Sequence, residues 1–232
     1  MLRYSPPVSR RRKQSSGHPA KRAAARTLTQ EPPLVRAAAA TPVIRGLRAV
    51  AAWVGEGVAV TATGVPRPGD IPDLCVALGL EPPPVRIRTA SRVPWLMSLW
   101  SVARAADVIQ VRGRKARPGL GLAGDALETW RNAFVRTVDG NDEEFIEGAE
   151  GGALVALQVL ARLPAPAGTA VDENALEATI REAAEAEGVS FDVAAGLELL
   201  AFFGAVARTP GQVTLTPLGG HLLTLLHELT PA

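Results

Sequence analysis

Three observations predict a mainly α-helical fold with short β-hairpins. Alanine supplies much of the 47% hydrophobic content, while aromatic residues make up only 4%, and alanine is the strongest helix former. Two apolar segments of helical character end alike, on a small residue followed by valine: LWSVARAADV at 99–108 and LELLAFFGAV at 197–206. Each then continues into two short extended stretches separated by a turn that contains glycine.

A helix, a tight exit and a two-stranded wing form the core of a winged helix. The repeated pattern therefore predicts two winged-helix-like units in tandem after a disordered basic tail. The expected parts are a tail at 1–44, a first unit at 45–120, a helix and acidic linker at 121–150, and a second unit at 151–232. Because the tail shows no apolar periodicity, a chain truncated to 45–232 is expected to fold.

The first unit is expected to begin with a helix at 46–54, whose apolar residues share one face. Gly55 ends it, as glycine commonly does just past a helix. Pro72 suits the first turn of a second helix. The elements expected after Gly55 are a strand at 58–63, a helix at 71–78, a helix at 93–106 and a wing strand at 108–111.

Beyond the first wing, Leu127, Trp130 and Phe134 recur at helical spacing and predict a helix over 126–138. Asp172 and Ser190 are typical N-cap residues. The elements expected in the second unit are helices at 153–163, 173–186 and 191–204, then a wing, then a closing helix within 215–229.

Charge is distributed unevenly, although the formal net charge is only +2. Residues 1–44 carry nine basic side chains and one acidic, and residues 45–119 carry eleven and five. Residues 120–232 carry five basic side chains and seventeen acidic ones. Such an asymmetry indicates different partners for the two halves of the chain.

The basic residues of the tail and of the first wing predict contacts with nucleic-acid phosphates. In winged helices the wing commonly meets the DNA backbone, so that resemblance implies a phosphate contact here. A solubilising tail and a solvated hairpin tip are the alternatives. The expected nucleic-acid-binding residues are Arg10, Arg11, Arg12, Lys13, Lys21 and Arg22 in the tail, and Arg112, Arg114, Lys115 and Arg117 in the wing.

The second unit is expected to contact protein rather than nucleic acid. Its helix at 173–186 carries Glu177, Glu182 and Glu185, which repel phosphate. Its third helix carries Asp192 and Glu198 and has none of the Arg, Asn or Gln residues that read base edges.

A further likeness lies in the segment 51–80. Trp53 and Gly55 stand before the expected strand, and Thr61, Thr63 and Gly64 stand at its end, followed by Asp70 and Leu74. On these residues, the segments 45–120 and 150–228 resemble an uncharacterised winged-helix-like protein family from GC-rich bacteria. The resemblance implies the fold and adds no particular activity.

No catalytic residue, metal ligand or cofactor is expected. Cys75 is the single cysteine, which excludes an internal disulfide. The G-x-G-x-x-G at 119–124 lacks the preceding strand of a dinucleotide site, and the acidic run at 139–150 lacks the turn glycine of a calcium loop. His221 and His227 are six residues apart and do not share a helix face.

The sequence thus predicts a non-catalytic, nucleic-acid-associated binding protein whose acidic second unit contacts another protein. No apolar run approaches the ~18 residues of a membrane span, so no membrane partner and a cytoplasmic location are expected. Two alternatives stay open: a protein-interaction scaffold without nucleic-acid binding, and a small-molecule or metal-binding protein that uses the acidic loop.

Overall fold

The computed structural model describes residues 32–84, 87–138, 149–163, 168–188 and 191–229. Residues 32–232 group into one compact unit. Within the described ranges the chain forms nine α-helices and two three-stranded antiparallel sheets, and it is about 59% helical. The fold is therefore mixed α/β, with the helical majority and the two hairpins that the sequence predicts.

The first helix lies inside the segment expected as disordered tail, and the second begins there. They are α2 (Pro33–Ala39) and α3 (Pro42–Val54), and each has a proline in its first turn, where the missing N–H is not needed. The Thr41 hydroxyl caps α3 by accepting from Ile44 N (3.3 Å). Val35 and Ile44 are buried. The expectation of disorder is therefore wrong for residues 33–44, because these prolines begin helices whose apolar faces join the core.

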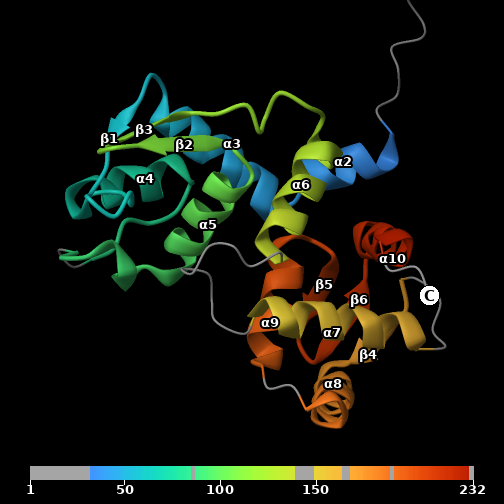
Figure 1. Cartoon of the computed structure of the whole chain (residues 1–232). Helices are drawn as coiled ribbons and strands as arrows, with labels where there is room; N and C mark the ends of the chain where they lie inside the picture. The colour runs from blue at the N-terminus through green and yellow to red at the C-terminus, as the bar shows by residue number, and fades with distance from the viewer. Residues whose placement is uncertain (1–31, 85–86, 139–148, 164–167, 189–190, 230–232) are drawn as a thin grey trace, which may run out of the picture. The chain divides into compact units, whose positions relative to one another are not determined.

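The first repeat of the fold runs from α3 to β3. Its sheet has the strand order β1-β3-β2, and helices α3 and α5 pack against this sheet. Figure 1 shows these elements together with α4. The strand expected at 58–63 is only two residues long, because Thr61 accepts from Gly64 N and donates to Val65 O in a turn. The elements after α3 are β1 (Val58–Ala59), 3₁₀ turn η1 (Pro68–Asp70), α4 (Ile71–Ala77), 3₁₀ turn η2 (Ala90–Arg92), α5 (Pro94–Ala105), β2 (Ile109–Arg112) and β3 (Lys115–Pro118).

The second repeat runs from α7 to β6 and has the same order of helices and strands. Its sheet order, β4-β6-β5, is that of the first sheet. The register agrees as well, since Val58 pairs with Ala116 in the first sheet and Val171 pairs with Val213 in the second. The elements are α7 (Ala149–Arg162), β4 (Ala170–Asp172), α8 (Glu173–Glu187), α9 (Val193–Phe202), β5 (Val206–Thr209) and β6 (Gln212–Leu215).

Both α5 and α9 end in a Schellman motif, which turns the chain into the following hairpin. The left-handed residue is Asp107 (φ 55°) in the first repeat and Gly204 (φ 68°) in the second. The bonds that define the motif are Val108 N to Ala103 O (2.8 Å) and Asp107 N to Arg104 O (3.0 Å), then Ala205 N to Leu200 O (2.8 Å) and Gly204 N to Ala201 O (2.9 Å).

The structure aligns the two repeats with a shift of one residue from the alignment that the sequence pattern predicts. The sequence pattern places Val108 opposite Val206, whereas the structure places Asp107 opposite Gly204 and therefore Ile109 opposite Val206. The repeats match at the left-handed residue, and the sequence hides this match because one residue is Asp and the other is Gly.

The first and third helices of each repeat cross at a glycine. A Cβ on Gly46 of α3 would lie 2.9 Å from a methyl carbon of Leu99 of α5. In the second repeat, a Cβ on Gly152 of α7 would lie 2.7 Å from Asp192 O, and Gly196 of α9 faces the Gly152 backbone. In the second repeat a side chain at either glycine would meet backbone and force the helices apart, whereas in the first repeat it would displace the end of the Leu99 side chain.

Each hairpin is followed by a further helix, α6 (Ala126–Val138) or α10 (Pro217–Leu229). The bounds of α6 agree with the sequence prediction. The Trp130 indole of α6 donates to the Phe203 carbonyl at the end of α9 (2.6 Å), and Phe134 packs edge-on against the Phe203 ring (5.2 Å between centroids). The helix between the two repeats thus belongs to the common core.

We expect Trp130→Phe to lower the free energy of unfolding by about 1–3 kcal/mol, because it leaves the buried Phe203 carbonyl without its donor. Thermal unfolding of the full chain measures the loss. Trp95→Phe is the matched control, because Trp95 is 45% exposed, and its effect should stay within about 0.5 kcal/mol. Equal losses in the two variants would contradict the role of the Trp130 hydrogen bond.

Truncation tests the corrected N-terminal boundary. A chain of residues 32–232 should unfold cooperatively at the temperature of the full chain, since it keeps α2 and α3 whole. A chain of residues 45–232 lacks Val35, Val43 and Ile44, which are all buried, and should lose several kcal/mol, at about 2–5 kcal/mol per large core side chain removed. Calorimetry of both chains is the measurement, and equal melting temperatures would contradict the packing of α2 and α3.

Candidate nucleic-acid interface

The four basic residues expected in the first wing share one hairpin. Ala116 is fully buried, so its neighbours Lys115 and Arg117 point to the outer side of the sheet. The register pairs Arg112 with Lys115 and Gln110 with Arg117. Together with Arg114 in the turn, these positions define the basic face, made of Arg112, Arg114, Lys115 and Arg117, all four exposed.

Neighbouring backbone fixes this hairpin in place. Val60 N donates to Arg114 O (3.0 Å), which ties the turn to the end of β1. A Cβ on Gly57 would lie 2.6 Å from Lys115 Cε and 3.3 Å from Arg117 Cγ. Gly57, at φ 126° and just before β1, therefore leaves room for the aliphatic parts of Lys115 and Arg117 to pack beside it. Sequence analysis missed this role of Gly57, because no local pattern shows that Lys115 and Arg117 approach it.

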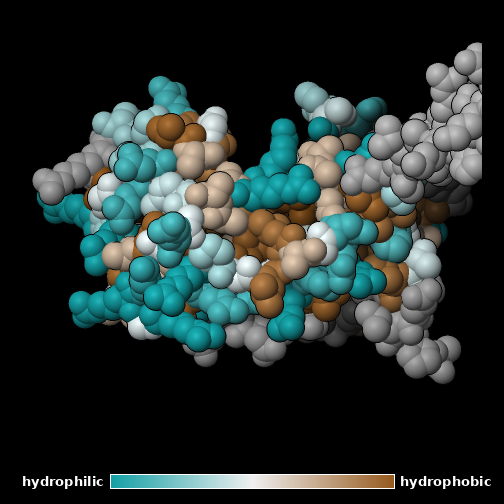
Figure 2. Space-filling model, turned by 90° about the horizontal axis from the view of Figure 1, so that it is seen from above, coloured by the Kyte–Doolittle hydropathy of each residue, from teal (hydrophilic) through white to brown (hydrophobic). Residues whose placement is uncertain are grey.

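No carboxylate within the described ranges pairs with the basic face. Arg112 donates to the Gln110 side-chain oxygen (3.2 Å), and the Gln110 amide donates in turn to Asp107 (2.9 Å). Arg112 and Lys115 stand directly opposite each other, and like charges in that position destabilise a sheet. The four side chains of the basic face are exposed, so their positive charge stays open to solvent. Figure 2, coloured by hydropathy, shows hydrophilic residues along the lower left of the molecule in that view.

The second sheet lacks this charge at the equivalent positions. Ala207 pairs with Thr214, and Thr209 pairs with Gln212, where the first sheet has Gln110 with Arg117 and Arg112 with Lys115. The one arginine of β5, Arg208, forms an ion pair with Glu173 of α8. The two sheets therefore have the same strand arrangement and differ in the charge of their outer faces.

The third helix of the first repeat offers little for reading base edges. Leu96, Leu99 and Trp100 of α5 are buried. The exposed side of α5 includes Trp95, which is 45% exposed, and Arg92 lies just before the helix. Recognition of base edges uses Arg, Lys, Asn or Gln that reach into a groove, and α5 itself contributes only Arg104, near its end.

The tail residues of the prediction lie outside the described residues. These are Arg10, Arg11, Arg12, Lys13, Lys21 and Arg22. The acidic segment 139–148 also lies outside them. The structure therefore brings together the wing residues of the predicted site and leaves the tail residues as a prediction.

The glycines at 119–124 have a structural cause. A Cβ on Gly119 would collide with Asp107 O, and one on Gly121 would collide with Ala106 O, at the exit of α5. This loop packs against a helix end, where only glycine fits. The expectation that no strand precedes these glycines is wrong, since β3 ends at Pro118. That strand is antiparallel to its neighbour, however, and α6 begins only at Ala126, so the loop still lacks the helix N-terminus that a dinucleotide site needs.

Cys75 is buried in α4, and burial raises the pKa of its thiol. A thiol with a raised pKa is a poor nucleophile at neutral pH.

Within the described part of the chain, no three His, Cys, Asp or Glu side chains gather as metal ligands. No helix in the described ranges has both the length and the hydropathy needed to cross a bilayer.

No family model, curated protein or solved structure matches this chain. The resemblance to a winged-helix-like family therefore stays a prediction.

Charge reversal at Lys115 tests the repulsion across the first hairpin. Lys115→Glu places a carboxylate opposite Arg112 and should leave the free energy of unfolding unchanged or raise it by up to about 1 kcal/mol. Lys115→Gln removes only the repulsion and should give a smaller gain. Denaturant unfolding measures both, and a loss above about 1 kcal/mol in Lys115→Glu would mean that the basic face is held by contacts rather than strained by repulsion.

Proposed function

We propose that this protein binds nucleic acid through the basic face of its first sheet, as a tandem winged-helix protein whose second repeat contacts protein. The single observation that carries the proposal is the contrast between the two sheets. Four exposed basic side chains stand on the first hairpin without a carboxylate partner among the described residues, and neutral residues stand at the matching positions of the second.

The order of elements supports the winged-helix assignment. Each repeat runs helix, strand, helix, helix, strand, strand, with its first strand added beside the last one. A winged helix has this order, with the final hairpin as its wing. The basic face occupies the first hairpin, which is the part of such a unit that commonly meets the nucleic-acid backbone.

The chemistry of the basic face favours phosphate over base edges. Arg and Lys that lie open on a sheet can each neutralise one phosphate and release its counterions. Contacts of that kind position a protein on the duplex without reading its sequence. Because α5 presents Trp95 and few hydrogen-bonding side chains, we propose binding that is independent of sequence.

The second repeat is assigned to a protein partner by its charge. Glu182 and Glu185 lie exposed on α8, with Glu177 half-buried beside them. These carboxylates repel phosphate and suit a basic surface on another protein. A protein-interaction scaffold without nucleic-acid binding is the competing function, and duplex binding by charge variants of the two sheets decides between them.

Two double variants of equal charge change test the site. Arg112→Gln with Lys115→Gln removes two positive charges from the first sheet, and Ala207→Glu with Thr209→Glu adds two negative charges to the second. The first should weaken binding of a 20-base-pair duplex about ten- to thirtyfold at 0.15 M salt, since two phosphate contacts are lost, and the second should change it less than threefold. Fluorescence anisotropy measures both.

Salt dependence provides the second readout. With about six phosphate contacts from the tail and wing, the slope of log affinity against log salt should be near −5 for the full chain and about 2 units shallower in the Arg112→Gln, Lys115→Gln variant. A duplex rich in A·T and one rich in G·C should bind alike. A slope shallower than about −2, or equal binding by the two double variants, would favour the scaffold.

A further inference from the structure

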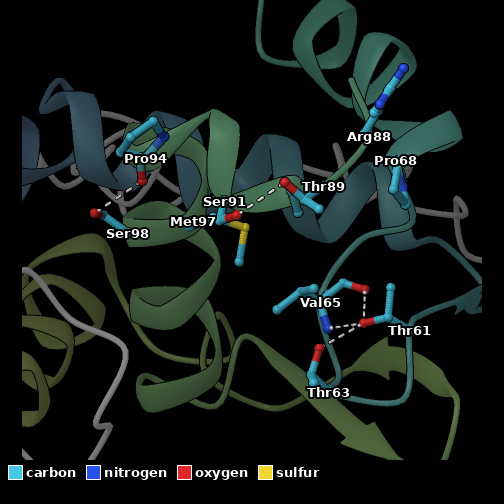
Figure 3. Close-up of a pocket in the computed structure, with 11 residues that line it drawn as sticks. Thr61, Thr63, Val65, Pro68, Arg88, Thr89, Ser91, Pro94, Met97 and Ser98 are labelled. Carbon is cyan, nitrogen blue, oxygen red and sulfur yellow. Dashed lines mark hydrogen bonds between the residues drawn. The ribbon is translucent and has the colours of Figure 1, made fainter. Parts of the chain in front are cut away.

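A cavity of about 520 Å³ lies beside the start of α5, apart from the basic face. Its volume falls in the range of small-molecule sites, roughly 300–1,000 Å³. Figure 3 shows the turn at 61–65 on one side and the segment 88–91 on the other. The lining residues include five hydroxyl-bearing side chains: Thr61, Thr63, Thr89, Ser91 and Ser98.

The walls of this cavity are held by hydrogen bonds. The buried Trp100 indole donates to Gly64 O (3.0 Å) and fixes the turn against α5. Within the turn, Thr61 Oγ1 accepts from Val65 N (3.2 Å) and donates to Val65 O (3.1 Å). The cavity is therefore formed before any ligand arrives, which lowers the entropy that binding would lose.

The hydroxyl groups present mainly acceptors. The Thr61 proton is given to Val65 O, so Thr63 is the donor in the bond between Thr61 and Thr63 (3.0 Å). Ser91 donates to Thr89 (3.2 Å), and Ser98 donates to Pro94 O (3.2 Å). The oxygens of Thr63, Ser91 and Ser98 keep their lone pairs, so a fitting ligand carries N–H or O–H donors.

The lining favours an uncharged ligand with a flat ring whose faces can lie on apolar side chains. None of the described lining residues is acidic, so a cationic amine has no partner there. Arg88 lies at the rim, and Figure 3 shows its side chain directed away from the other lining residues. Val65, Ala90 and Met97 supply apolar surface, and the Met97 thioether is a favourable contact for an aromatic ring.

We propose that this cavity binds a nucleoside, with its base on Met97 and Val65 and its N–H or O–H groups donating to Thr63 and Ser91. A nucleoside combines a flat ring, several uncharged donors and a size suited to the cavity. The site does not depend on the basic face, and it goes beyond the proposed binding of nucleic-acid phosphates. A free nucleoside and an unstacked nucleoside within a single strand are the two sources of this chemistry.

Isothermal titration calorimetry of the full chain with adenosine, cytidine or uridine tests the site. At least one should bind, and Thr63→Val and Ser91→Ala should each weaken it about three- to tenfold, as the loss of one hydrogen bond does. Thr179→Val, the same change on the exposed face of α8, should leave the affinity unaltered. Melting temperatures within 2–4 °C of the parent chain, about 1 kcal/mol, establish that the variants are folded.

Three results would overturn the proposal. The first is no binding of any of the three nucleosides up to about 5 mM. The second is binding that Thr63→Val and Ser91→Ala leave unchanged. The third is ribose alone binding as well as the nucleoside, or adenosine 5′-monophosphate binding more than about tenfold tighter, a 1.4 kcal/mol difference. A single-stranded oligonucleotide that competes with the nucleoside identifies the strand as the source, and a lack of competition identifies the free molecule.

Discussion

The exits of α5 and α9 are the constraint on which the rest of the structure depends. A single left-handed residue, Asp107 or Gly204, reverses the chain at the end of each third helix and sends it into a hairpin. The carbonyls left at those helix ends then position later parts of the chain, since Gly119 and Gly121 approach the first exit closely and Trp130 donates to Phe203 O at the second. The direction of both hairpins and the position of α6 depend on these two helix ends.

The second exit also explains why the two repeats share one core. Phe203 presents its carbonyl to Trp130 and its ring to Phe134, so α6, which leaves the first hairpin, is anchored on the end of α9. A buried carbonyl without a donor costs about 1–3 kcal/mol. The helix between the repeats therefore belongs to the core, and a chain cut there would expose apolar surface on both sides.

The first sheet keeps a repulsion that lowers its stability. Arg112 and Lys115 repel each other across the hairpin, and the matching residues Thr209 and Gln212 of the second sheet do not. A surface that keeps unpaired like charges is one that a polyanion can stabilise, because the ligand supplies the missing counter-charge. The cavity beside α5 differs in kind, since its lining combines hydroxyl groups with apolar side chains and has no acidic residue among those described.

The sequence by itself determined much of the local structure, because helices and hairpins depend on nearby residues. The spacing of Trp130 and Phe134 predicted α6 to its ends, and the charges on β2 and β3 identified the basic face. Tertiary structure decided what depends on distant contacts: the helical state of residues 33–44, the one-residue shift between the repeats, and the pairing of Lys115 with Arg112. It also decided the cavity, because Trp100 and Gly64 are 36 residues apart in the chain, and no local pattern reports that they meet.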